Sequence, residues 1–411
     1  MRSIRSPREL PIALVFASIA LLGGCATSRD DGAAVSPIFY EPFEIVSPDT
    51  LTTMLEYKVQ KLAEVDPKNP LADPRAPQTL SLFGREDLIA TTSDDYHATA
   101  CEPSAVDGDP LDEIARLAAR TSIVIVNESH ERTRHRGFTA RIANRLRPLG
   151  YDTLAIEALN NTLPGTLEQF LPSTMTRPEQ AFLEDEDGYY LSEAAFGRLG
   201  RRAKTLGYRF LPYEHIDEER LPEDASWEMR IAVREEGQAN NIVAFLREHP
   251  DAKLLIHVGY SHATEVPHAD GARWMATRLK EKTGIDLLTI SQTTCRGGSD
   301  MVRLAKLPSS VPPGTFDLVV DHPEATFVRG RPEWRMEAGD RPVDIPQSLR
   351  PTSGWRIVEA RPAEEPTSAV PIDRVAIRPG DDIALMLPPG RYKLRAVDVP
   401  HAEPSPSASG D

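Results

Sequence analysis

The sequence predicts an α/β fold in which a mostly parallel sheet carries helices on its faces, with a smaller β-rich module after it. Between residues 104 and 298, short apolar runs alternate with longer segments of helical periodicity. Two of the short runs, residues 122–126 and 253–258, are predominantly apolar, as buried parallel strands are. After residue 298, short β runs separated by Pro and Gly predict a small sandwich-like module.

The elements of the central block follow from periodicity and from residues that break helices. Helices are expected where apolar residues recur at helical spacing, in residues 109–120, 131–146, 227–248 and 269–283. Strands are expected in residues 122–126, 151–156, 208–213, 253–258 and 286–291. Pro148 and Gly150 mark the end of the second helix, and a helical insertion is expected over residues 166–206.

The ends of the chain differ from this block. A helix is expected over residues 52–62, followed by Pro-rich coil. Late strands are expected in residues 316–320, 355–360, 374–377, 383–387 and 391–397. The expected organisation is a signal peptide (1–24), a tether and N-terminal extension (25–103), the α/β domain (104–298), the β-rich module (299–400) and a disordered tail (401–411).

Composition limits the function classes. The 411 residues carry 47 Lys and Arg against 62 Asp and Glu, a formal net charge of −15. Such a chain lacks the basic surface that nucleic-acid binding requires, so no nucleic-acid partner is expected. Beyond the first 25 residues, no apolar stretch reaches the length of a membrane span.

The N-terminal residues read as a targeting segment. Basic residues among the first eight precede the apolar residues 11–22, which end in Gly23-Gly24, as in a secretory signal. Cys25 follows directly, and this arrangement resembles the lipobox of bacterial lipoproteins. The resemblance implies that Cys25 is lipidated and anchors the protein in a bilayer of the cell envelope. Ala26 favours the outer membrane. The alternative is an ordinary signal followed by a coincidental cysteine.

Two further cysteines remain once Cys25 is set aside as the lipidated residue. Cys101 and Cys295 form an even set in an oxidising compartment, which predicts a disulfide between them. Because Cys295 follows the strand expected at 286–291, the bridge would clamp the N-terminal extension to the sheet. Two unpaired buried thiols are the alternative.

Two tetrapeptides with similar endings follow the two most apolar strands: Asn127-Glu128-Ser129-His130 and Gly259-Tyr260-Ser261-His262. In open α/β sheets, ligands bind beyond the carboxyl ends of the strands. We therefore expect both histidines to face one pocket. Other charged residues follow further strands or lie on the helix before the second motif, namely Glu157, Glu214 and Arg234.

These residue types suit the activation of water. Histidine acts as a general base near neutral pH, a nearby carboxylate can orient it, and arginine can stabilise an oxyanion. Nitrogen and oxygen donors also suit a divalent metal ion, with His130, His262 and Glu128 as its ligands. The plainer alternatives are that each glutamate caps a helix and that His257 is a satisfied core histidine.

The order of these motifs resembles the ChaN/Tiki/erythromycin-esterase superfamily. Glu128-x-His130, His135 on the next helix, Glu157, Arg234 and Gly259-x-x-His262 carry the resemblance, over roughly residues 115–292. One departure is Asn127, where the family usually has Gly. Because Asn tolerates left-handed backbone better than most residues, we expect the turn to survive.

The resemblance implies three different activities. Metal-dependent proteases would place His130, His262, Glu128 and Glu157 around an ion, whereas erythromycin-esterase-like members would use a histidine to activate water without metal. ChaN-like surface lipoproteins are associated with haem and iron uptake, with Tyr260 or His135 as haem ligands.

We favour a hydrolase acting on an ester or peptide. A haem- or iron-binding lipoprotein and a non-catalytic envelope protein are the alternatives. His135, Glu214 and Tyr260 are expected to line the pocket, whose ligand is a small molecule, a peptide or haem. Gly259-Tyr-Ser261-His-Ala also fits a nucleophile elbow. This interpretation is less favoured because Pro267 delays the helix that must follow the serine. The cofactor and the oligomeric state stay open.

Overall fold

The computed structural model describes residues 43–47, 51–90, 99, 101–162, 171–189, 191–216 and 221–400. All of them belong to one compact unit. The predicted signal peptide, Cys25 and the tail at 401–411 lie outside the described residues. Among the helices described, none is both long enough and apolar enough for a bilayer span.

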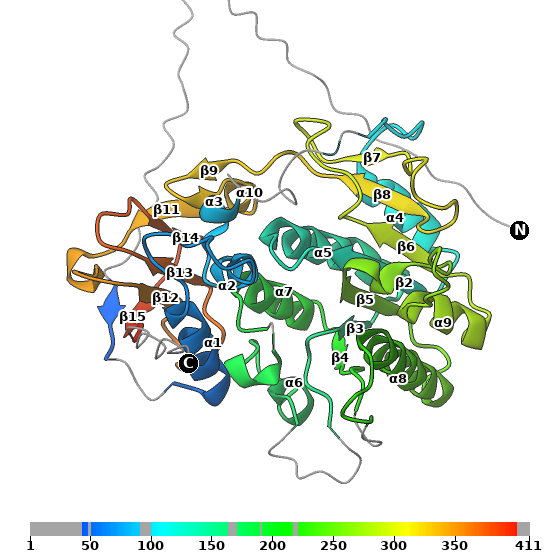
Figure 1. The fold of residues 1–411 in the computed structure, drawn as a ribbon, viewed down its shortest axis with the longest axis horizontal. Coiled ribbons are helices and arrows are strands. Elements are labelled where there is room, and N and C mark those ends of the chain that lie inside the picture. The colour runs from blue at the N-terminus through cyan, green and yellow to red at the C-terminus, as the bar shows by residue number, and fades with distance from the viewer. Residues whose placement is uncertain are drawn as a thin grey trace, which may run out of the picture. The chain divides into compact units, whose positions relative to one another are not determined.

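A seven-stranded sheet is the centre of the fold, with strand order β4-β3-β5-β2-β6-β8-β7 (Figure 1). Every neighbouring pair is parallel except β7 with β8, which is antiparallel. The strands are β2 (Ile123–Glu128), β3 (Thr153–Ile156), β4 (Arg209–Leu211), β5 (Leu254–Gly259), β6 (Leu288–Ser291), β7 (Arg303–Ala305) and β8 (Leu318–Asp321). The predicted α/β class is confirmed.

Both faces of this sheet are covered, which explains the unbroken apolar run of β2. Successive side chains of a strand point to opposite faces. Val124 and Val126 belong to a core shared with α4, α5 and α7, while Ile123 and Ile125 belong to a second core shared with α8 and α9. These helices are α4 (Pro110–Ala118), α5 (Thr133–Leu146), α7 (Ala194–Thr205), α8 (Trp227–Glu248) and α9 (Met275–Thr283).

Smaller antiparallel sheets form the C-terminal part, and they confirm the predicted β-rich region. The largest has strand order β1-β15-β12-β13, in which β1 alone pairs in parallel, and the others pair β11 with β14 and β9 with β10. The strands are β1 (Glu44–Ile45), β9 (Phe327–Val328), β10 (Arg331–Pro332), β11 (Arg341–Asp344), β12 (Arg356–Pro362), β13 (Asp373–Ile377), β14 (Ala384–Leu387) and β15 (Tyr392–Asp398).

The remaining helices are short or come from the N-terminal extension. They are α1 (Thr53–Ala63), α2 (Ala76–Leu82), α3 (Glu86–Ile89), α6 (Ser173–Thr176) and α10 (Trp334–Glu337). The expected helix at 52–62 is therefore α1, with Thr52 as its N-cap accepting a hydrogen bond from the Leu55 amide. The helix expected at 269–283 begins later, at Met275.

Two segments pack differently from the expected organisation. Strands β7 and β8 lie after residue 298 yet extend the large sheet, because Leu318 and Val319 of β8 pair in parallel with β6 and buried Val320 pairs with β7. The N-terminal helices α1 and α2 bury Leu55 and Leu80 in a core that includes Trp355 of the C-terminal region. A short amphipathic helix needs such a partner surface to bury its apolar face.

The predicted disulfide between Cys101 and Cys295 is present, with a sequence separation of 194 residues. Cys295 is fully buried just after β6. Isolated bridges Thr99–Arg296 and Pro103–Ala305 pair the flanking backbone on both sides. The bond therefore fixes the start of the α/β region to the far edge of the sheet.

Removing this disulfide should destabilise the protein without changing its fold. In a Cys101→Ala/Cys295→Ala variant, the unfolded chain regains the entropy of a long open loop, which corresponds to a loss of about 2–5 kcal/mol. Urea unfolding of the oxidised protein and of the variant measures this difference. An unchanged free energy of unfolding would show that the bridge contributes nothing to stability.

Candidate active site

The two histidine motifs lie side by side at the C-terminal edge of the sheet. Strand β5 lies between β2 and β3, so the two motifs end neighbouring parallel strands. In this register Glu128, the last residue of β2, is opposite Gly259, the last residue of β5. Glu157 follows β3 on the other side of β5, and His262 lies in the 3-10 turn Tyr260–Ala263 that follows β5.

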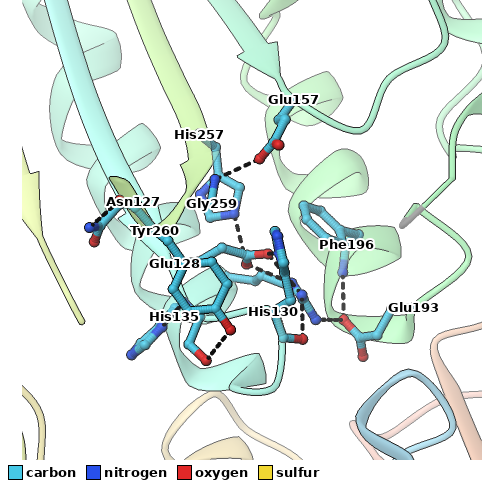
Figure 2. Close-up of polar contacts among 12 residues, drawn as sticks. Asn127, Glu128, His130, His135, Glu157, Glu193, Phe196, His257, Gly259 and Tyr260 are labelled. Carbon is cyan, nitrogen blue, oxygen red and sulfur yellow. Dashed lines mark hydrogen bonds and ion pairs between the residues drawn. The ribbon is translucent and has the colours of Figure 1, made fainter. Parts of the chain in front are cut away.

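The buried carboxylate of Glu128 contacts three other side chains of the site (Figure 2). Its Oε1 lies 2.9 Å from His130 Nδ1, and its Oε2 lies 2.9 Å from Nε2 of His257. Arg136 donates from Nε to Oε2 at 2.8 Å and from Nη2 to Oε1 at 2.9 Å. Burial alone would raise the pKa of Glu128, but Arg136 and the two imidazoles outweigh it and keep this pKa well below the ordinary value.

The guanidinium of Arg136 is itself held by several neighbouring groups. Its Nη1 donates to Glu193 at 3.0 Å and its Nη2 to the His130 carbonyl at 3.0 Å. The guanidinium lies 4.3 Å from the centre of the Phe196 ring. This planar group therefore holds Glu128 in one orientation and also braces the backbone of His130.

His130 is oriented by Glu128 and lies against bare backbone. A carboxylate only accepts hydrogen bonds, so the neutral imidazole carries its proton on Nδ1 and its lone pair on Nε2. A Cβ at Gly259 would stand 2.8 Å from His130 Nε2 and 3.1 Å from Glu157 Oε2. Glycine at 259 is therefore required for this imidazole and this carboxylate to approach the same point.

Glu157 links the two histidines. Its Oε2 accepts the Gly259 amide at 2.6 Å, and its Oε1 accepts Arg234 Nη2 at 2.6 Å. The same Oε1 lies 3.2 Å from His262 Nε2. Although burial opposes ionisation, His262 and Arg234 hold the pKa of Glu157 well below the ordinary value, so this group is a carboxylate near neutral pH.

His262 lies between two carboxylates. Its Nδ1 is 2.8 Å from Glu235 Oε1, and its Nε2 faces Glu157. Burial lowers the pKa of His262, but the charges and hydrogen bonds of Glu157 and Glu235 outweigh burial and raise it to about 10. His262 is therefore an imidazolium near neutral pH. Glu235 also accepts the Met275 amide at the start of α9, at 2.7 Å.

Arg234 extends the site towards solvent. Its Nε and Nη2 donate to the two oxygens of Glu214, at 3.1 and 2.5 Å, and Gln238 donates to both oxygens of Glu214 at 3.2 Å. The side chains of Arg234 and Glu214 are 30% and 26% exposed, whereas Glu157 is 7% exposed. Arg234 and Glu214 thus form a charged, solvent-accessible rim, and Glu157 lies buried beneath them.

Tyr260 has strained backbone beside the site. Its φ of 31° is in the left-handed region, which is unfavourable for a bulky residue. Its ring meets His130 edge-on at 5.1 Å between centroids, and its hydroxyl lies 3.2 Å from Ser129 Oγ. The side chain is therefore wedged between the first histidine motif and solvent.

Asn127 corrects one expectation. It lies within β2 in extended backbone, so no left-handed turn depends on it, and Tyr260 is the residue with positive φ. Its amide donates to the Tyr260 carbonyl at 2.9 Å and to Thr293 Oγ1 at 3.0 Å, and its oxygen accepts the Gln292 amide at 2.7 Å. Asn127 thus braces the strained turn.

A cavity of about 770 Å³ opens beside the cluster. Its lining residues include Ser129, Arg132, His135, Tyr260 and Arg296. His135 accordingly lies in this cavity and not among the carboxylates. Its Nδ1 accepts the Ser129 amide at 3.0 Å. Burial, with smaller contributions from His322 and Arg132, lowers the pKa of His135 well below its ordinary value.

The proposed metal ligands do not suit a divalent ion in this arrangement. Both oxygens of Glu128 bind the guanidinium of Arg136, and the imidazolium of His262 has no lone pair to donate. Within the described ranges, no group of three or more His, Cys, Asp or Glu side chains is placed to hold a metal. The chemistry of the donors therefore favours proton transfer over ligation.

Sequence reasoning missed several members of the cluster. The buried His257 was expected to be a satisfied core histidine, and it is satisfied, but its partner is Glu128. Nothing in the sequence singled out Arg136 or Glu235, although Glu235 lies next to Arg234. Ser261 does not form a nucleophile elbow, because the next α-helix starts only at Met275.

The raised pKa of His262 predicts a pH-dependent stability. Its folded-state pKa of about 10 exceeds the ordinary 6.5, so the stabilisation is complete below about pH 6.5 and is lost as pH rises towards 10. A His262→Ala variant should lose about 3–5 kcal/mol near neutral pH, since Glu235 loses its buried cationic partner. Urea unfolding from acid to alkaline pH measures the difference from wild type, with the exposed His249→Ala as control. A difference independent of pH would contradict the assignment.

Comparisons with known proteins reach the fold alone. No family model and no curated protein matches the chain. Eleven solved chains do. The type III effector HopBA1 has a TM-score of 0.35 and 13% identity, over 57% of this chain and 100% of that one. RRSP, a MARTX toxin effector domain from Vibrio vulnificus CMCP6, has a TM-score of 0.33 and 15% identity, and the match covers 53% of this chain and 38% of that one. ChaN of Campylobacter jejuni, solved with cofacially bound haem, has a TM-score of 0.34 and 9% identity, and the match covers 51% of this chain and 90% of that one. Likeness at this level says nothing of activity.

Proposed function

We propose that this protein is a hydrolase of the ChaN/Tiki/erythromycin-esterase type that activates water with His130 to cleave an ester or a peptide bond. The observation that carries the proposal is the different setting of the two histidines. Nδ1 of His130 is hydrogen-bonded to Glu128, whereas His262 lies between Glu157 and Glu235, which raise its pKa to about 10. We infer that His130, which Glu128 orients through Nδ1, acts as the general base and that the charged His262 supplies electrostatic stabilisation.

In the proposed reaction His130 acts first as a proton acceptor and then as a proton donor. Nε2 of His130 takes a proton from water as the water oxygen bonds to the acyl carbon, and the carbonyl becomes an oxyanion. The positive charges of Arg234 and His262, which share Glu157 Oε1, stabilise that oxyanion. The C–O or C–N bond then breaks, and the imidazolium of His130 returns its proton to the leaving group. Glu128 keeps His130 in the required tautomer and stabilises its charge.

The cavity beside Tyr260 gives the substrate a place to bind. At about 770 Å³ it has the size of a small-molecule or short-peptide site. We further propose that this site lies outside the cytoplasm, on a protein anchored to the outer membrane through lipidated Cys25. The disulfide supports an oxidising compartment, because such bonds persist there and not in the cytosol.

Haem binding is the second candidate, and Tyr260 is the observation in its favour. Tyr260 is 40% exposed and lines the cavity together with Arg132 and Arg296, which suit propionate groups. His135 suits the role less well. Its Nδ1 accepts the Ser129 amide, so in the neutral ring Nε2 carries the proton and offers no lone pair to iron.

Substitution of His130 or Glu128 should lower the activity of the protein without unfolding it. His130→Ala and Glu128→Gln should each lower kcat/KM by about 100-fold or more on the best substrate of an ester and peptide panel, since general base catalysis supplies about that much. His249→Ala, exposed at the end of α8, is the matched control and should keep wild-type activity. Thermal unfolding checks that each variant is folded. Wild-type rates in folded His130→Ala would refute the proposed base.

Metal removal should leave the reaction unchanged. The donors of the cluster are occupied by Arg136 and by protons, so dialysis against EDTA should preserve kcat/KM, and added Zn²⁺ should not increase it. A haem titration of the same protein tests the second candidate through the Soret band, with Tyr260→Phe as the matched variant. Loss of activity in EDTA with recovery on adding metal would require a different site geometry.

A further inference from the structure

A second cavity, of about 760 Å³, lies between α5, α7 and α10 and is lined by an unusual number of arginines. Six line it, namely Arg134, Arg136, Arg141, Arg198, Arg201 and Arg202. Glu337 is the one acidic residue among the described lining residues, and its side chain is 66% exposed. The proposed hydrolase mechanism uses only Arg136 of this set.

The positive charge of this cavity is only partly neutralised. Arg198 pairs with Asp340 at 2.8 Å, and Arg201 pairs with Glu365. In the part of the chain that the structure describes, Arg141 and Arg202 form no ion pair. Arg141 lies 5.6 Å from the centre of the Phe138 ring, and Arg202 donates to the Asn144 amide oxygen. At least two guanidinium charges are thus left for a ligand.

Several polar atoms of the lining are buried without a hydrogen-bond partner among the described residues. They are Nη1 of Arg134, Nη1 of Arg201, the indole Nε1 of Trp334 and Nδ1 of His322. A buried donor without a partner is unfavourable, so such groups call for an acceptor. Three of these atoms are N–H donors of residues that line one cavity, which favours a ligand rich in acceptor oxygens.

His322 is the deepest of these groups, at 2% exposure. Its Nε2 donates to Gln292 Oε1 at 2.8 Å, which leaves Nδ1 as the lone-pair nitrogen of the neutral ring. Burial, followed by the charges of Arg134, Arg132 and Arg141, lowers the pKa of His322 well below its ordinary value. An anion in the cavity would reverse this effect and allow Nδ1 to become a further donor.

We propose that the arginine-rich cavity is a binding site for a multiply charged organic anion that carries phosphoryl groups. Arginine forks match phosphate oxygens, and the cavity volume suits a ligand larger than a single phosphate. Trp334 and Phe138 supply an aromatic wall for an apolar or aromatic part of the ligand. Arg136 lines this cavity and also holds Glu128, whereas the Arg141 and Arg202 side chains do not touch the histidine cluster, so these two residues test the site separately from the hydrolase proposal.

Calorimetric titration of the full-length protein with inorganic pyrophosphate tests the proposal. We expect saturable binding that weakens as salt rises, and an Arg141→Ala/Arg202→Ala variant should bind about tenfold or more weakly, because two charge-assisted contacts are lost. Both side chains are exposed, so the variant should fold and keep wild-type hydrolysis. Arg145→Ala is the matched control, since it lies on α5 outside the cavity.

A parallel titration with phosphatidylglycerol vesicles distinguishes a free ligand from a lipid headgroup. Binding of either probe that depends on Arg141 and Arg202 supports the site and identifies the source of the phosphate. A Trp334→Phe variant should lose the fluorescence change that accompanies binding. No binding of either probe, or equal weakening by Arg145→Ala, would overturn the proposal.

Discussion

The buried carboxylate of Glu128 is the interaction on which the site depends. It accepts a two-point contact from Arg136 and lies within hydrogen-bonding distance of two imidazoles, so three charged or polar side chains have fixed positions around it. A carboxylate without these partners could not stay ionised in a dry core, and the imidazoles would lose their orientation without the carboxylate. The carboxylate and its partners therefore depend on one another, and this mutual dependence keeps the site preorganised.

The second half of the site repeats this principle with a different result. Glu157 and Glu235 flank His262, and together these two carboxylates raise the pKa of its imidazole to about 10. Gly259 joins the halves, because the missing side chain lets His130 and Glu157 approach the same backbone position.

Much of this arrangement could be predicted from local sequence. Alternating strand and helix patterns gave the sheet, and the residues after each strand had to gather at one edge, which placed Glu128, Glu157 and His262 correctly. The choice of partners could not be predicted, since it depends on which turn of a neighbouring helix faces the strand end. Arg136 and Glu235 are ordinary helical residues until packing places them against a buried group. The packing of α1 on the C-terminal sheet could not be predicted from the sequence for the same reason.

The position of β5 between β2 and β3 also affects the order in which the protein folds. Arg136 is eight residues from Glu128, so this contact can form early in folding. His257 is 129 residues from Glu128, and it reaches Glu128 only when β5 pairs between β2 and β3. Long-range parallel pairing of this kind is slow to form. Until β5 arrives, the inner edges of β2 and β3 stay unpaired and exposed to other chains. The same strand that completes the site therefore also covers one edge of β2 and one edge of β3.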